Sequence, residues 1–262
     1  MSHADVNGVS LYYEEQGTGE PLVLLHGGLG AGAEFEAIMP TLCAGRRVIT
    51  VDLQAHGGTA DVDRPLRPET MADDIAALIG HLGLERADVM GYSLGGLVAL
   101  RTAIQHPEVV RRVVLVSVGF RRDGSHPEVV QNMDQFSPEL APVLQQSPLY
   151  ERYARLAPRV EDWPVLVAKT SAMLKEDYDW TAEVQGLETP TMLVYADADS
   201  IRPAHIVEFY ALLGGGLRDA NWDGSLRSTA RLAILPGTTH YDVYASPALA
   251  PAVTAFLDAD AL

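Results

Sequence analysis

Cysteine is nearly absent from this sequence of 262 residues, in which Cys43 is the single thiol. One thiol cannot form an intramolecular disulfide, and the first residues contain neither a basic segment nor an apolar signal core. We therefore expect a cytoplasmic protein without disulfides. Long apolar runs are missing as well, and no stretch approaches the roughly 20 residues that span a bilayer, which argues against an integral membrane protein.

Basic residues are also scarce in this sequence. It has 19 lysines and arginines against 35 aspartates and glutamates, a formal net charge of −16. Such a charge disfavours non-specific binding to nucleic acids or to anionic membrane surfaces. No His-x-x-x-His pattern and no cluster of cysteines and histidines indicates a metal site. We expect a small-molecule substrate, no cofactor, and a monomer or a homodimer.

Short apolar runs alternate with helical patterns along most of the chain. The runs read as buried strands and lie at 21–25, 46–52, 87–92, 109–118, 189–195 and 230–235. Before them, residues 9–15 alternate between apolar and polar positions in the manner of a half-buried strand. Helices are expected at 31–42 and at 70–82, the second with Thr70 as its N-cap. Strands that alternate with helices predict an α/β fold with a mostly parallel, doubly wound sheet. Ligands bind such sheets at the carboxyl ends of the strands.

The alternation stops between residues 120 and 185, where prolines and aromatic residues are frequent and helical runs are short. A structureless connection of this length is unusual inside a compact domain. We therefore predict a helical cap insertion at 120–185 that lies over a core domain formed by 1–119 and 186–262. Met133, Met173 and Leu174 are candidates to line an apolar acyl pocket, although most such residues in helices pack internally.

The most informative motif is the Gly-x-Ser-x-Gly pentapeptide Gly91 to Gly95, which follows an apolar strand and opens a helix rich in small residues. A serine hydroxyl becomes a useful nucleophile when it is held clear of the backbone, beside a base and close to amide donors. A sharp turn between strand and helix supplies the first and the last of these. Such a pentapeptide also occurs by chance, but the strand and helix around it make Ser93 the candidate nucleophile.

A second loop carries candidate donors for an oxyanion. The strand at 21–25 ends in His26-Gly27-Gly28, where backbone with few side chains can turn its amides towards a bound oxygen. We predict an oxyanion hole formed by the backbone amides of Gly28 and Leu94. Without Ser93, the same loop would be interpreted as a plain connection. His26 itself is expected to be structural.

The base and the acid of a serine triad should follow late strands. His240 follows the last strand and a Pro-Gly turn, and its one rival is His56, whose loop lies at the same sheet edge. Asp197 and Asp199 both follow the preceding strand. Asp199 lies further into the loop, where its side chain can turn back to His240. We therefore predict Ser93, His240 and Asp199 as catalytic residues.

In chain order, Ser93, Asp199 and His240 resemble the serine, acid and histidine of the α/β-hydrolase superfamily, in its branch of small capped esterases. The resemblance covers nearly the whole chain and implies an α/β-hydrolase fold with about eight strands. The acid of similar proteins ends a Gly-x-x-Asp turn, which matches residues 196–199 except that alanine replaces glycine. The sequence departs from the family at Gln54-Ala55, where similar proteins usually carry arginine and glycine.

Ser93, the central residue of the turn, limits the classes of reaction that we expect. Haloalkane dehalogenases and epoxide hydrolases, which the sequence also resembles, use aspartate where this chain has Ser93. The expected activity is hydrolysis of small to medium carboxylic esters through an acyl-enzyme. A lactone is an internal ester, so lactonase activity, including that on N-acyl homoserine lactones, is the main alternative. Less favoured alternatives are a carbon–carbon bond hydrolase, a perhydrolase and a catalytically silent ligand receptor.

Overall fold

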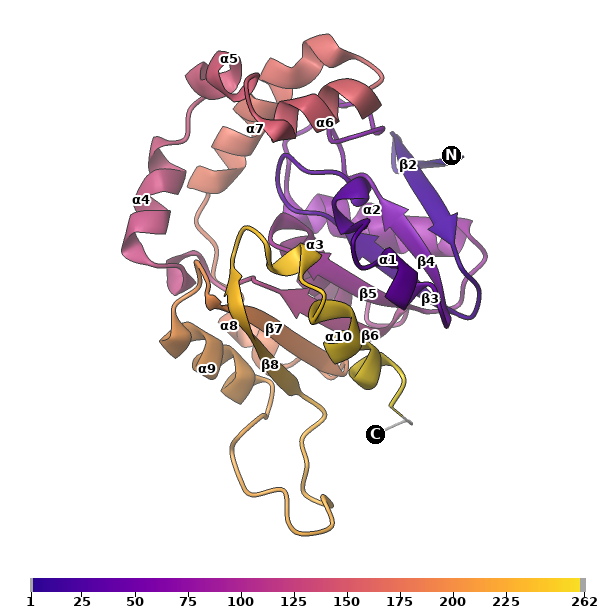
Figure 1. Cartoon of the computed structure of the whole chain (residues 1–262), viewed down its shortest axis with the longest axis vertical. Coiled ribbons are helices and arrows are strands. Elements are labelled where there is room, and N and C mark those ends of the chain that lie inside the picture. Colours follow the sequence, from indigo (N-terminus) through magenta and orange to yellow (C-terminus); the bar gives the residue numbers. More distant parts are fainter. Residues whose placement is uncertain (1, 260–262) are drawn as a thin grey trace.

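A sheet of eight strands forms the centre of the computed structural model, which describes residues 2–259 (Figure 1). The strands are β1 (Ser2–Val6), β2 (Val9–Gln16), β3 (Glu20–Leu25), β4 (Arg46–Val51), β5 (Ala87–Tyr92), β6 (Val110–Val116), β7 (Thr191–Ala198) and β8 (Arg231–Thr239). Their order in the sheet is β1-β2-β4-β3-β5-β6-β7-β8. β1 and β2, and likewise β2 and β4, are antiparallel, and the other neighbours are parallel. The predicted α/β fold with a mostly parallel sheet is confirmed.

Helices cover both faces of this sheet (Figure 1). They are α1 (Met39–Leu42), α2 (Pro68–His81), α3 (Leu94–Gln105), α9 (Pro203–Leu212) and α10 (Leu249–Leu257). Side chains of α2, α3 and α9 form one apolar core against the sheet, and those of α1 and α10 contribute to a second. Leu22 to Leu25 of β3 are therefore buried on both sides, which explains why this strand reads as a continuous apolar run.

The chain between β6 and β7 forms a further group of helices, of which α4 to α7 lie beyond the carboxyl ends of the strands (Figure 1). They are α4 (Pro127–Gln135), α5 (Ala141–Leu144), α6 (Pro148–Leu156), α7 (Trp163–Lys175) and α8 (Thr181–Gln185). Short 3₁₀ helices lie at Gly32–Phe35, Arg122–Gly124, Pro138–Leu140, Val160–Asp162 and Val243–Ala245. Trp163 is fully buried, and its ring packs against the rings of Tyr150 and Tyr153. The division into a core and a cap at 120 and 185 stays a prediction.

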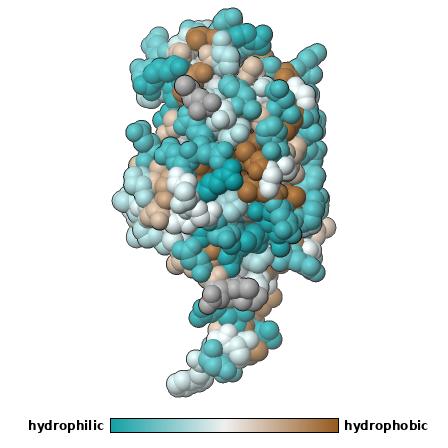
Figure 2. Space-filling view, turned by 90° about the vertical axis from the view of Figure 1, so that its right-hand side faces the viewer, coloured by the Kyte–Doolittle hydropathy of each residue, from teal (hydrophilic) through white to brown (hydrophobic). Residues whose placement is uncertain are grey.

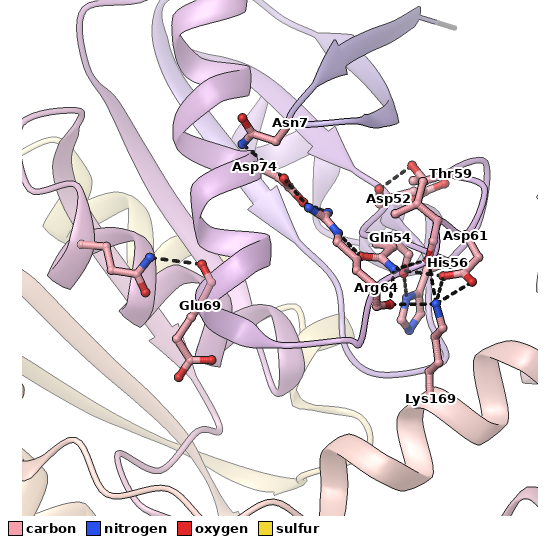
Figure 3. A network of polar contacts seen from close by, with 12 residues as sticks. Asn7, Asp52, Gln54, His56, Thr59, Asp61, Arg64, Glu69, Asp74 and Lys169 are labelled. Carbon is pink, nitrogen blue, oxygen red and sulfur yellow. Dashed lines mark hydrogen bonds and ion pairs between the residues drawn. The ribbon is translucent and has the colours of Figure 1, made fainter.

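A polar network ties α7 to the loop that follows β4 (Figure 3). Nζ of Lys169 lies 2.9 and 2.7 Å from the two carboxylate oxygens of Asp61, and 2.7 Å from the carbonyl oxygens of Val62 and Arg64. Gln54 donates to the same Asp61 carboxylate at 2.9 Å and accepts a hydrogen bond from Arg64 at 2.7 Å. Gln54 therefore helps to hold the loop that receives Lys169.

Three local features differ from the expectations. An additional strand, β1, pairs with β2 through a tight turn at Asn7-Gly8, whose φ angles of 46° and 81° suit a two-residue hairpin turn. α2 begins at Pro68 with Arg67 at the N-cap position, so Thr70 lies inside the helix. The single helix expected at 31–42 is a 3₁₀ helix followed by the short α1.

Polar side chains cover most of one face of the molecule (Figure 2). The face shown in Figure 2 is largely hydrophilic, with apolar residues gathered in small patches. The connection between α9 and β8 projects as a long loop from the end of the sheet opposite α4 to α7, and it carries the fully exposed Trp222 (Figures 1 and 2). No described helix is long and apolar enough to cross a membrane.

Candidate active site

Ser93 lies in the sharp turn between β5 and α3. Its φ of 51° and ψ of −114° are strained for a residue with a side chain and hold the hydroxyl clear of the strand. The turn requires glycine on both sides of the serine. A Cβ on Gly91 would lie 2.0 Å from the carbonyl oxygen of Gly95, and a Cβ on Gly95 would lie 2.2 Å from that of Leu25. The pentapeptide thus has the geometry of a nucleophile elbow.

The structure brings Ser93 together with two residues from distant loops. Nε2 of His240, which follows β8, lies 3.2 Å from Oγ of Ser93. Nδ1 of the same ring lies 3.2 Å from Oδ1 of Asp199, which follows β7. Tyr92 holds the loop of His240, since its hydroxyl donates to the His240 carbonyl oxygen at 2.7 Å. Because β5, β7 and β8 are parallel, their carboxyl ends meet at one edge of the sheet and the three residues become neighbours.

Asp199 is buried and accepts several hydrogen bonds. The Ser117 hydroxyl donates to Oδ2 at 2.5 Å, and the amides of Ala196 and Ile201 donate at 2.9 and 3.2 Å. Burial raises the pKa of Asp199, but hydrogen bonds from His240 and Ser117 outweigh burial and hold this pKa below its usual value. Asp199 is therefore a carboxylate at neutral pH.

Asp197, the alternative acid, points elsewhere. Its exposed carboxylate accepts the backbone amides of Gly237 and Thr238 at 3.0 and 3.1 Å, and these hydrogen bonds lower its pKa. Asp197 therefore fixes the turn that leads to His240, while Asp199 contacts the ring.

The sequence pattern does not indicate two further serines that contact this group of residues. Oγ of Ser200 lies 2.9 Å from Nδ1 of His240, slightly closer than the carboxylate of Asp199. Ser117 follows β6 directly and has a φ of 52°. The available signal for Ser117 is its position at the carboxyl end of the strand between β5 and β7. For Ser200, the available signal is that it directly follows Asp199 in the chain.

Gly28 and Leu94 are neighbours in the wall of the cavity that contains Ser93. A Cβ on Gly28 would lie 4.0 Å from that of Leu94, and within residues 2–259 neither amide donates to a protein acceptor. The next amide, of Gly95, donates to the carbonyl oxygen of His26 at 2.9 Å. This hydrogen bond joins the loop of residues 26–28 to the start of α3. Two unused donors beside Ser93 are what a developing oxyanion requires.

The two histidines of the neighbouring loops take part in internal hydrogen bonds. Nε2 of His26 accepts the Leu53 amide at 3.0 Å, and Nδ1 of His56 lies 2.8 Å from the Gln54 carbonyl oxygen. Complete burial lowers the pKa of His26 to about 4 and that of His56 to about 3. His56 does not line the cavity that contains Ser93. The structure therefore does not place it as a base for the serine.

Ser93 and His240 open into a cavity of about 550 Å³ beneath the helices between β6 and β7. Met133, Met173 and Leu174, the candidates from the sequence, all line it. The wall is mostly apolar, and the volume lies within the range of small-molecule sites in proteins.

Two charged side chains interrupt this apolar wall. Of the carboxylates, ammonium groups and guanidinium groups in the described chain, only those of Glu34 and Arg152 line the cavity. Oε1 of Glu34 accepts the Gly27 amide at 2.7 Å, and Nη1 of Arg152, from α6, lies 3.5 Å from Oε2. Burial raises the pKa of Glu34 to about 7, against the lowering effects of the Gly27 amide and of Arg152. The sequence pattern indicates neither residue.

A mostly parallel sheet with a serine elbow at its centre defines the class of α/β hydrolases. The chain belongs to that family, since the model of the alpha/beta hydrolase fold matches residues 20–214. It is 28% identical over 247 residues to the putative carbamate hydrolase RutD of Azorhizobium caulinodans, covering 84% of this chain and 88% of that protein.

Solved structures with the same fold include enzymes with different substrates. A thermophilic esterase from Thermogutta terrifontis has a TM-score of 0.71 and 22% identity, covering 98% of this chain and 96% of its own. An enol-lactonase from Burkholderia xenovorans LB400 has a TM-score of 0.72 and 21% identity, covering 98% and 100%. At these identities the likeness shows the fold alone, and it confirms the predicted α/β-hydrolase fold.

Proposed function

We propose that the protein is a serine carboxylic ester hydrolase that acts on small to medium acyl esters. The observation that carries the proposal is the 3.2 Å contact between Oγ of Ser93 and Nε2 of His240 at the wall of a largely apolar cavity. A nucleophile within hydrogen-bond reach of a base, with Asp199 orienting that base, is the arrangement that acyl transfer needs.

Acylation of the serine is the first half of the proposed reaction. Oγ of Ser93 attacks the carbonyl carbon of the ester while Nε2 of His240 takes the hydroxyl proton. Asp199 holds the ring through Nδ1 and stabilises the imidazolium. The amides of Gly28 and Leu94 bind the negatively charged oxygen of the tetrahedral intermediate. His240 then gives its proton to the departing alcohol, and the acyl group stays on Ser93.

Hydrolysis of the acyl-enzyme is the second half. His240 removes a proton from a water molecule, whose oxygen attacks the acyl carbonyl carbon, and the same two amides bind the second oxyanion. The intermediate collapses when Ser93 leaves and regains its proton from His240. The apolar side chains of Met133 and Met173 suit the alkyl part of the acyl group.

A chain-length series of 4-nitrophenyl esters, from acetate to octanoate, tests this proposal. The wild-type protein should release nitrophenolate, and Ser93→Ala should lower kcat by about 10⁴-fold to 10⁶-fold because the nucleophile is gone. Ser10→Ala, at an exposed position in β2, is the matched control and should keep full activity. An inactive wild-type protein, or full activity in Ser93→Ala, would contradict the proposal.

The same preparation separates the ester hydrolase from its main alternative. Ring opening of N-hexanoyl homoserine lactone is measured beside hydrolysis of 4-nitrophenyl hexanoate, and each kcat/KM is normalised to the reaction rate of its substrate with hydroxide. A higher normalised value for the lactone would favour a lactonase with the same triad. A silent receptor would in addition fail to react at Ser93 with a fluorophosphonate, which mass spectrometry detects.

A further inference from the structure

Glu34 and Arg152 differ in how many of their hydrogen-bonding atoms already have a partner in the protein. Glu34 is buried, with one oxygen bonded to the Gly27 amide and the other beside Arg152. Arg152 makes only the long 3.5 Å contact with Glu34 and, among the residues that the structure describes, none of its five N–H donors forms a hydrogen bond. Its side chain retains 26% exposure. The group that a ligand can still engage is therefore the guanidinium.

A free guanidinium in an apolar wall favours one class of ligand group. A carboxylate accepts two parallel hydrogen bonds from an arginine, and such charge-assisted pairs gain strength where apolar side chains exclude water. The apolar residues that line the same cavity as Arg152 include Leu149 and Phe136. A neutral ester gives this guanidinium no charged partner, so Arg152 would remain underused with a purely alkyl substrate.

From this asymmetry we infer that Arg152 is a specificity-determining residue that binds a carboxylate on the substrate. The preferred esters then carry a free carboxylate in addition to the ester that Ser93 attacks. Glu34 contacts Nη1 of Arg152, and in the described chain Nη2 and Nε of Arg152 form no hydrogen bond. This inference rests on the proposed ester hydrolase activity for its kinetic consequence, but the binding of a carboxylate does not depend on turnover.

A purely structural role for Arg152 makes a different prediction. Arg152 lies on α6 and Glu34 on the core, so the pair also links these two parts of the molecule. If that link were its whole role, loss of Arg152 would change the hydrolysis of neutral and anionic esters by the same factor. A carboxylate site instead changes their ratio.

Two pairs of substrates test the inference, because the carboxylate can be placed on either side of the ester. The first pair is 4-nitrophenyl hydrogen adipate and its methyl ester, and the second is 4-butanoyloxybenzoate and its methyl ester. Adipate is chosen because shorter diacid monoesters hydrolyse by attack of their own carboxylate. kcat/KM is measured for wild type, for Arg152→Met, which keeps an unbranched apolar stem, and for Arg155→Met. Arg155 is an exposed arginine on the same helix and serves as the matched control.

In at least one pair, Arg152→Met should lower the ratio of kcat/KM for the acid to that for its methyl ester by tenfold or more. The methyl esters should be hydrolysed at nearly the wild-type rate, which also shows that the variant is folded, and Arg155→Met should keep the wild-type ratio. A change of less than fivefold in both pairs would overturn the inference. So would an equal loss on acids and methyl esters.

Binding to Ser93→Ala keeps this test independent of the proposed function. Titration calorimetry with monomethyl adipate and with dimethyl adipate should show tighter binding of the acid by at least tenfold, and the difference should disappear in Ser93→Ala/Arg152→Met. Equal affinities for acid and diester would overturn the carboxylate site even if ester hydrolysis is observed. If the wild type hydrolyses none of the four substrates while the binding preference holds, it is the ester hydrolase proposal that fails.

Discussion

Oδ1 of Asp199 lies 3.2 Å from Nδ1 of His240, whereas Asp197, two residues earlier, binds backbone amides of the turn before that histidine. Asp199→Asn should therefore lower kcat for a 4-nitrophenyl ester by about 10³-fold to 10⁴-fold. The amide cannot stabilise the imidazolium and favours the wrong tautomer of the ring.

Asp197→Asn provides the matched control for this change. The same substitution at an exposed carboxylate should alter kcat by less than about threefold, because the ring of His240 keeps its partner. Ser200, whose hydroxyl lies 2.9 Å from Nδ1, has no charge with which to replace Asp199. A larger loss in Asp197→Asn than in Asp199→Asn would reverse the assignment of the acid.

Glu34 should make the stability of the protein depend on pH. Burial raises the pKa of Glu34 from 4.5 to about 7, so the folded state holds its proton more tightly than the unfolded state. The stabilisation from that proton is complete below pH 4.5 and is lost as the pH rises through 7, a change of up to about 3 kcal/mol. Glu34→Gln has no proton to lose at this position, and its side-chain oxygen still accepts the Gly27 amide.

The Tm of Glu34→Gln relative to wild type should therefore rise by several degrees between pH 5 and pH 8, as measured by scanning calorimetry. Glu36→Gln, at an exposed position two residues further on, should show a small Tm difference at both pH values. A Tm difference for Glu34→Gln that falls with increasing pH would show that Glu34 is stabilised as a carboxylate by Arg152.

Lys169 should determine how firmly α7 is held over the sheet. Its ammonium contacts the Asp61 carboxylate and two carbonyl oxygens of the same loop, and Lys169→Met leaves these acceptors without a cationic donor. We expect local opening to become easier by about 1–3 kcal/mol, which corresponds to roughly 5-fold to 150-fold faster amide exchange.

Hydrogen exchange followed by mass spectrometry measures this effect. Peptides from α7 and from residues 54–64 should exchange faster in Lys169→Met, while peptides from β5 and β6 should not change. Lys175→Met removes the same charge from an exposed position at the end of α7 and should leave the exchange of both regions as in wild type. Identical exchange in the two variants would show that the network of Figure 3 contributes little to holding α7.

The parts of the fold that could be predicted are those that a short stretch of sequence specifies by itself. The strand at 21–25 is apolar because helices cover both faces of the sheet, and Gly91 and Gly95 mark the elbow because only glycine fits there. The β1 hairpin also has a local signal in Asn7-Gly8, whose positive φ angles suit these residue types. Ala55 shows the limit of such signals, since it has a φ of 65° although alanine does not indicate a left-handed conformation.

The remaining features depend on how separate elements come to lie together. Glu34 and Arg152 meet because α6 approaches the 3₁₀ helix at Gly32–Phe35, and no local pattern specifies that placement. Ser117 follows β6 and Asp199 follows β7, and the two residues touch because these strands are neighbours in the sheet. A long stretch of chain separates the two strands, so no local pattern shows that they pair. A sequence pattern indicates which strands and turns form, whereas contacts between loops follow from the strand order and from the placement of the helices between β6 and β7.

Gly95 and Gly80 have opposite surroundings, one crowded by backbone atoms and the other open. A Cβ on Gly95 would lie 2.2 Å from the carbonyl oxygen of Leu25 and 2.6 Å from that of His26, backbone atoms that cannot turn aside. Gly95→Ala should therefore cost about 1–3 kcal/mol of stability or more and, by displacing the loop that carries Gly28, lower kcat by about 10²-fold. Gly80→Ala, near the end of α2 with no atom within 4 Å, should stabilise the protein by about 0.5–1 kcal/mol and leave kcat unchanged.

Urea unfolding measures the stability of both variants, and ester hydrolysis measures their kcat. A Gly95→Ala protein with wild-type stability and activity would show that neither property requires the close contact of Gly95 with the carbonyl oxygens of Leu25 and His26.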